Sequence, residues 1–198
     1  MPSGRQASWL SVGCVVLGLG VALLLAADWG SDGYSTLVNG IAIRTDMSFW
    51  VVNLLVGTVL VALAAARRVR PGPGTVVQVV VVGVTVSVFL DLIGTPAATG
   101  LRVLLITAAF PVLAIGIALY LGSHTGAGPA DGAALAGDPP VPVRGSYSAV
   151  QGGGALVGWL LGATIGVGTI AVIFLLGPAV DLVSRRLGLD VHQAGRHG

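Results

Sequence analysis

The sequence predicts an all-α integral membrane protein, and three observations support that prediction. Of its 198 residues, 55% are hydrophobic and 9% are charged, whereas a soluble domain carries about 25% charged residues. The apolar residues form runs close to the roughly 20 residues that a helix needs to cross a bilayer core of about 30 Å. The arginines lie at the ends of these runs. A soluble fold of this size would expose too much apolar surface.

Six apolar runs are expected to cross the membrane as helices. They occupy residues 9–27, 49–66, 75–93, 101–121, 147–164 and 169–183. The third run begins with a valine-rich stretch that resembles a strand, but a lone strand in lipid would leave its backbone groups unpaired, so we expect a helix. The first run exceeds the roughly 7–15 apolar residues of a signal peptide, so we expect it to be retained.

The placement of arginine predicts that both termini lie in the cytoplasm. With six spans, only Arg44 and Arg102 fall on the side opposite to the N-terminus, and the other eight arginines fall on the same side as it. Cytoplasmic loops of membrane proteins carry this excess of basic residues. The basic residues therefore indicate topology rather than nucleic-acid binding. Lys is absent, which indicates GC-rich bacterial coding, so we expect a multi-pass protein of the bacterial cytoplasmic membrane.

An internal repeat divides the chain into residues 1–98 and 99–186, followed by a polar cytoplasmic tail at 187–198. Residues 20–30 align with 116–126 at an offset of 96, with five of eleven positions identical. Each unit holds three expected spans, so a homologous second copy must enter the membrane from the opposite side. The sequence thus predicts two inverted three-helix repeats, as in many secondary transporters. The alternative is chance similarity between glycine-rich apolar segments.

Two long loops, at residues 28–48 and 122–146, hold most of the candidate functional residues. They begin at equivalent positions, Asp28 and His124, and continue into Asp32 and Asp131. If the loops dip into the membrane, they line a substrate pathway with backbone groups and carboxylates. The alternative is an interfacial loop whose aspartates cap short helices, such as one over residues 34–43. Asp91, near the end of the third span, joins these candidates because ionisable residues within spans are usually functional.

Glycines mark two further features. The first is a pair of Gly-x-Gly-Thr turns at an offset of 94, one with Gly72, Gly74 and Thr75 and the other with Gly166, Gly168 and Thr169. The threonines of these turns are expected to be the N-caps of the third and sixth spans. Helix starts of this kind attract anions, but without a following Lys neither turn is a phosphate loop. The second is a ridge of small residues on the fifth span, expected to allow close helix packing within the monomer or at a homodimer seam; it comprises Gly154, Gly158 and Gly162.

Three segments resemble a known family of bacterial membrane proteins. They are Gly-Ser-Asp-Gly-Tyr at 30–34, Gly-Ala-Gly-Pro-Ala-Asp-Gly at 126–132 and Gly-Trp-Leu-Leu-Gly-Ala-Thr-Ile-Gly-Val-Gly-Thr at 158–169. Together they resemble the YczE/YyaS/YitT group. The chain departs from that pattern at Gly33, Ser35 and Ala130, where the group has Pro, Asp and Arg. The resemblance implies a multi-pass membrane protein and no settled activity.

Two functions from different classes fit these observations. Inverted repeats and paired glycine loops favour a permease or exporter of a small solute. The scarcity of charge within the spans favours a membrane-embedded regulatory or interaction protein that moves nothing. No cluster of His and carboxylate residues has metal-ligand spacing and no nucleophile lies beside a base, so we expect neither an enzyme nor a cofactor. The expected partners are the lipid bilayer, a small solute and a second copy of the chain, and no nucleic acid.

Overall fold

The computed structural model describes residues 4–69, 71–137, 140 and 142–189 of the chain. Within these ranges every regular element is helical, which confirms the all-α prediction. The elements are α1 (Gly4–Ala27), α2 (Gly33–Thr45), α3 (Phe49–Ala66), α4 (Pro73–Ile93), α5 (Thr99–Gly122), α6 (Pro129–Leu135), α7 (Val143–Leu160), α8 (Val167–Ala171), the π-helical segment η1 (Val172–Leu176) and α9 (Gly177–Leu187).

Five helical stretches of the described chain are long and apolar enough to cross a membrane. They are α1, α3, α4, α5 and the continuous stretch from Val167 to Leu187 that α8, η1 and α9 form. Five of the six predicted spans therefore agree with one of these stretches to within five residues at each end. The remaining one, the fifth in chain order, corresponds to α7, which is long enough but not apolar enough to be counted with them.

The helix α7 lies four residues earlier in the chain than the sequence predicts. It covers 143–160 instead of 147–164, because the backbone at Gly162 turns into the left-handed region with φ of +110°. The N–H of Ala163 then bonds to the carbonyl of Gly158 at 2.9 Å, which closes the helix end. Gly162 therefore lies beyond the helix, and its inclusion in a packing ridge on the fifth span is wrong.

The last span is longer than predicted and contains a π-helical segment. The sequence predicts 169–183, whereas the helical stretch runs from Val167 to Leu187. Pro178 interrupts the apolar pattern; it has no N–H and its ring crowds the carbonyl one turn earlier. The π-helical segment at 172–176 lies directly before it and absorbs this crowding without breaking the helix.

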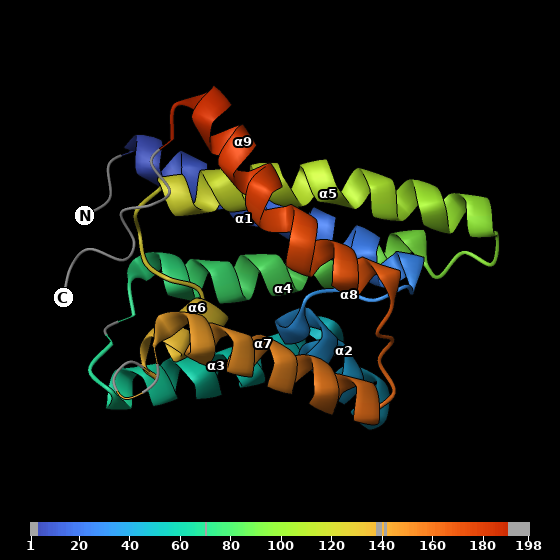
Figure 1. Ribbon diagram of the computed structural model, residues 1–198, viewed down its shortest axis with the longest axis horizontal. Helices are drawn as coiled ribbons and strands as arrows, with labels where there is room; N and C mark the ends of the chain where they lie inside the picture. The colour runs from blue at the N-terminus through green and yellow to red at the C-terminus, as the bar shows by residue number, and fades with distance from the viewer. Residues whose placement is uncertain (1–3, 70, 138–139, 141, 190–198) are drawn as a thin grey trace.

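The long helices lie side by side along the longest dimension of the molecule (Figure 1). Helix α1 packs against α5 and α4, α9 covers α5, and α3 packs against α4 on the other side. Where these helices meet, a buried apolar core joins α1, α2, α3, α4 and α5; its largest members include Leu24, Val38, Val52, Val86 and Leu113.

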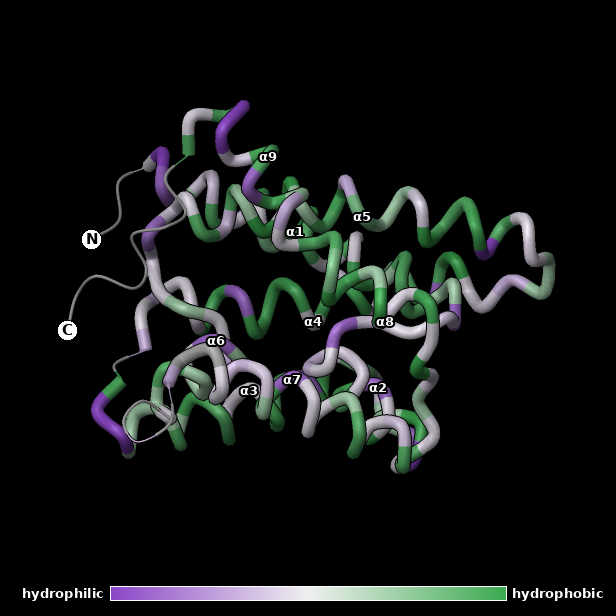
Figure 2. The backbone as a smooth tube through the Cα atoms, viewed as in Figure 1, coloured by the Kyte–Doolittle hydropathy of each residue, from purple (hydrophilic) through white to green (hydrophobic). Residues whose placement is uncertain are grey.

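The outer surface of this bundle is apolar. Leu63, Leu104 and Phe174 are 57%, 62% and 70% exposed, and many other large aliphatic side chains are similarly exposed. Figure 2 shows apolar residues along most of the length of the long helices, with hydrophilic residues at their ends and around α2, α6 and α7. An apolar surface of this extent is unusual in a soluble monomer and is expected where lipid is the solvent.

Two helices are too short to cross a membrane. Helix α2 has 13 residues and α6 has 7, which corresponds to lengths of about 20 Å and about 10 Å against a bilayer core of about 30 Å. The sequence places the first of them at 34–43 as one of two alternatives, and the structure contains it. Figure 1 shows α2 and α6 toward opposite ends of the bundle, between the layers of long helices.

Candidate functional site

Both short helices begin inside the bundle and run outward. The first residue of α2, Gly33, lies against Gln151 midway along α7, whereas Gly40 lies against Gly158 near the end of α7. On the other side, Gly128, the N-cap of α6, lies beside Gln78 inside α4. The chain thus turns back into the bundle after α1 and again after α5 (Figure 1). The positive ends of two helix dipoles consequently point inward.

Asp32 caps the inner end of α2. Its carboxylate accepts a hydrogen bond from the N–H of Ser35 at 3.0 Å, and its backbone is extended, as an N-cap requires. The preceding residue, Ser31, is buried and shares a 3.0 Å hydrogen bond with the hydroxyl of Thr36. Asp32 therefore fixes the start of α2 and is only partly exposed.

Asp131 occupies the first turn of α6, at the inner end of the second short helix. Its carboxylate lies beside Gly128, the N-cap of that helix. Of the five residues that the sequence predicts for a substrate pathway, Asp32 and Asp131 are the two that lie at the inner ends of the short helices.

A polar network from α2, α3, α4 and α7 surrounds the inner end of α2. The hydroxyl of Tyr34 donates to the side-chain oxygen of Asn53 at 2.9 Å, and the amide of Asn53 donates to the carbonyl of Val79 at 2.7 Å. The side chain of Gln151 accepts from the N–H of Tyr34 at 3.0 Å. Polar side chains of α3 and α7 thus hold the start of α2, and Asn53 also joins α3 to α4.

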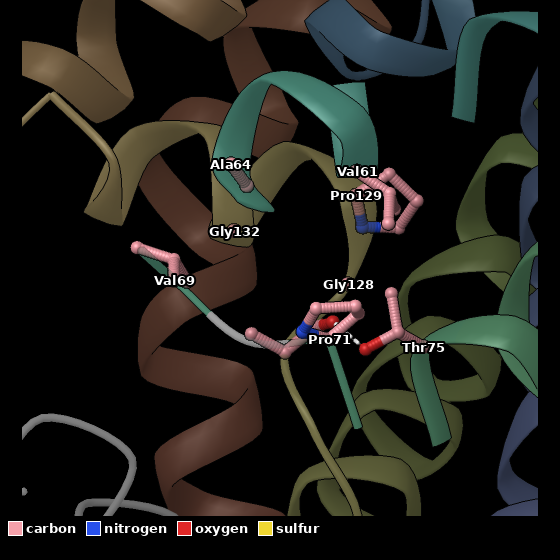
Figure 3. Close-up of a pocket in the computed structure, with 9 residues that line it drawn as sticks. Val61, Ala64, Val69, Pro71, Thr75, Gly128, Pro129 and Gly132 are labelled. Atoms are coloured by element: carbon pink, nitrogen blue, oxygen red, sulfur yellow. Dashed lines mark hydrogen bonds between the residues drawn. The ribbon is translucent and has the colours of Figure 1, made fainter. Parts of the chain in front are cut away.

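One buried acceptor beside α6 has no partner. The side-chain oxygen of Gln78 is shielded from solvent, lies close to Gly128, and receives no hydrogen bond in the described part of the chain. A cavity of about 20 Å³, room for about one water molecule, lies nearby between α3, α4 and α6 (Figure 3). Its walls include Val61, Thr75 and Pro129.

The two glycine loops each bond to a Gly-x-Gly-Thr turn that is distant in sequence. The N–H of Gly74 donates to the carbonyl of Thr125 at 3.0 Å, and the N–H of Gly168 donates to the carbonyl of Trp29 at 2.8 Å. The turns lie at opposite ends of the bundle (Figure 1), so they form two separate contacts. Each loop is thus hydrogen-bonded to the start of a long helix at the point where the chain turns back into the bundle.

The threonines of these turns are not the N-caps that the sequence predicts. Gly72 and Gly166 hold the N-cap positions, and Thr75 and Thr169 lie three residues further on, inside α4 and α8. The hydroxyl of Thr75 accepts from the N–H of Gly72 at 3.2 Å and donates to the carbonyl of Ala127 at 2.7 Å. The hydroxyl of Thr169 is buried and has no hydrogen-bond partner among the residues that the structure describes. Both side chains face the crossing loops, at Ala127 and Gly30, and Thr75 also bonds to the start of α4.

The remaining predicted pathway residues lie away from the inner ends of α2 and α6. Asp28 forms an ion pair with Arg102 at 3.5 Å and accepts from the hydroxyl of Thr164 at 2.6 Å, which ties the end of α1 to the start of α5. His124 and Asp91 are exposed on the surface. Among the described residues no group of three or more His, Cys, Asp or Glu could hold a metal ion.

The site residues predicted from the sequence do not include Tyr34, Asn53 or Gln151. Gln151 carried a usable signal, because a lone amide among the glycines of an apolar segment needs a polar partner. Tyr34 carried none, since its position next to Asn53 depends on where α2 turns back into the bundle. The glycines Gly154 and Gly158 lie against α2, at Gly33 and Thr36.

Comparison with known proteins gives a family but no activity. An uncharacterised protein of Haemophilus influenzae is 26% identical over 168 residues, which cover 84% of this chain and 77% of that protein. No solved structure matches. The resemblance to the YczE/YyaS/YitT group is not confirmed, because the family that matches is described only as one of unknown function. That match extends over residues 4–185, from α1 to α9, and the chain therefore belongs to the family of unknown function DUF6198.

Proposed function

We propose that this protein moves a small solute across the membrane, through a pathway at the inner ends of α2 and α6. The observation that carries the proposal is that two short helices begin inside the bundle, each with an aspartate, Asp32 or Asp131, at its inner end. Helices that begin at mid-depth present free N–H groups and carboxylates where a solute has to pass, and discontinuous helices serve this purpose in secondary transporters.

The proposed topology has six passes in two inverted three-helix repeats, with both termini in the cytoplasm. The crossed loop contacts support it: Thr125 and Trp29 differ by 96 residues, Gly168 and Gly74 differ by 94, and both offsets are those of the sequence repeat. Helix α7 is the sixth pass. Its composition is less apolar than that of the other spans, because α2 and α6 pack against it and cover part of its surface.

The two short helices α2 and α6, which we call the half-helices, together account for one crossing of the bilayer. Their lengths of about 20 Å and about 10 Å add up to the thickness of the hydrocarbon core, provided that they enter from opposite sides. The small cavity beside Gln78 admits about one water molecule, so this conformation is occluded to any larger solute. Transport therefore requires the bundle to open toward each side in turn.

A flux measurement tests the proposal. The purified chain in proteoliposomes is assayed with labelled amino acids, sugars, organic acids and amines, each with and without a proton gradient. We expect uptake of at least one class, reduced about tenfold or more in Asp131→Asn, as expected if at least about 1.4 kcal/mol of stabilisation is lost. Asp91→Asn is the matched control, because Asp91 is exposed and lies outside the pathway.

The outcomes of this assay separate two functions. Equal flux in the native chain and Asp131→Asn would mean that the pathway does not pass the inner ends of the half-helices. Absence of flux for every solute class would favour the second function, a membrane-embedded regulatory or interaction protein. The small size of the cavity beside α6 is the observation that favours that second function.

A further inference from the structure

A second concave feature lies on the outside of the bundle, apart from the half-helix pathway. It is a groove of about 330 Å³ between α2 and α3, which we name the α2–α3 groove. Its walls are apolar side chains only, and include Leu37 and Ile41 from α2, Val52, Val56 and Leu60 from α3, and Met47 from the connection between them.

The groove has room for one hydrocarbon chain. It follows α3 for about 12 Å, from Val52 to Leu60, and has a volume of about 330 Å³. A helix with side chains is about 10–12 Å wide, so a second copy of this chain would place single side chains, and not a whole helix, in the groove.

The rim of the groove faces the hydrocarbon of the bilayer. Leu55 and Val59 of α3 are 54% and 58% exposed there. Exposed Trp50, at the start of α3, marks headgroup level, since tryptophan is enriched at that depth. The groove thus begins near the headgroups at its Met47 end and descends along α3 toward the membrane interior.

A basic residue, Arg44, lies near the headgroup end of the α2–α3 groove. Arg44 lies in the last turn of α2, three residues after Ile41, and is exposed. In the described part of the chain no carboxylate pairs with it, although Asp46 follows two residues later. Because Arg44 follows Ile41 by one helical turn, its guanidinium is within reach of the phosphate of a phospholipid whose acyl chain lies in the groove.

We propose that the α2–α3 groove is a binding site for one membrane phospholipid, with an acyl chain along α3 and the phosphate on Arg44. Such a lipid fills the space beside the half-helix α2, which extends through only part of the membrane. The site is independent of any transported solute, so it stands or falls separately from the proposed pathway.

Photolabelling tests the site in the native chain. The purified protein is reconstituted with a trace of phospholipid that carries a diazirine on one acyl chain, illuminated and mapped by mass spectrometry. We expect peptides that contain residues 37–60 to carry several-fold more label than the faces of α4 and α5 around Val80 and Leu104, which are comparably exposed. Equal labelling of these faces would show only annular lipid and would overturn the proposal.

Variants test the two halves of the site. Val56→Trp fills the groove and should abolish the preferential labelling, whereas Val80→Trp on α4 should retain it. Arg44→Gln should weaken retention of one phospholipid through delipidation by about tenfold, as expected for a lost charge-assisted bond. If the native chain carries no lipid and is a dimer that Val56→Trp dissociates, the groove is a protein seam and the lipid proposal is wrong.

Discussion

Replacing Gly158 by alanine should destabilise the protein by about 3 kcal/mol, a large effect for a single methyl group. A Cβ at this position would fall on the backbone of Thr36, within α2, whose carbonyl carbon would be 2.5 Å away. Backbone atoms cannot rotate aside as a flexible side chain can, so α2 would have to move away from α7.

The same helix offers a matched control. At Gly153, five residues earlier in α7, an added Cβ meets no atom within 4 Å. Gly153→Ala should therefore be neutral or slightly stabilising, because alanine favours helix more than glycine does. Thermal unfolding in detergent should place the midpoint of Gly158→Ala roughly 6–12 °C below that of the native chain. Equal midpoints for the two variants would mean that α2 does not contact α7 in this way.

Replacing Gly168 by alanine should lower the free energy of unfolding by a similar amount, about 2–3 kcal/mol. Its Cβ would fall on the backbone carbonyl of Gly30 and lie 3.0 Å from that of Trp29. The hydrogen bond from Gly168 to Trp29 would lengthen, and the loop that carries Asp32 into the bundle would lose its attachment.

Two further substitutions make this prediction specific. Gly74→Ala, in the corresponding turn, should cost a comparable amount because its Cβ meets Thr125. Gly177→Ala lies on the same helical stretch as Gly168 and meets nothing within 4 Å, so it should be tolerated. If Gly74→Ala unfolds the protein and Gly168→Ala does not, the two loops are not held in equivalent ways.

Secondary structure could be predicted from this sequence, because lipid leaves few options for apolar segments. The span 49–66 agrees residue for residue with α3, and the valine-rich run became α4 because a membrane helix satisfies its own backbone. The errors arose at local backbone features. Gly162 ends α7 early, and the π-helical segment before Pro178 lets the last span continue.

The arrangement of the candidate site was only partly predictable. The loops at 28–48 and 122–146 were recognised from their glycines, but their direction, back into the bundle or along the surface, depends on contacts between distant segments. Asp28 and Asp32 illustrate this. They are four residues apart, yet one pairs with Arg102 at the end of α1 and the other caps α2 inside the bundle. Composition and spacing do not distinguish two such environments.

The central claim is that α2 and α6 enter the bundle from opposite sides of the membrane. Cysteine labelling tests it directly, since the native chain has one cysteine, Cys14, which is buried and can be replaced by serine. In that background, Asp46→Cys marks the outer end of α2 and Ala136→Cys, at the C-cap of α6, marks the outer end of α6. In intact cells, we predict that a membrane-impermeant maleimide labels Asp46→Cys and labels Ala136→Cys only after the cells are opened. Labelling of both positions from the same side would contradict the opposed half-helices and the transport function that rests on them.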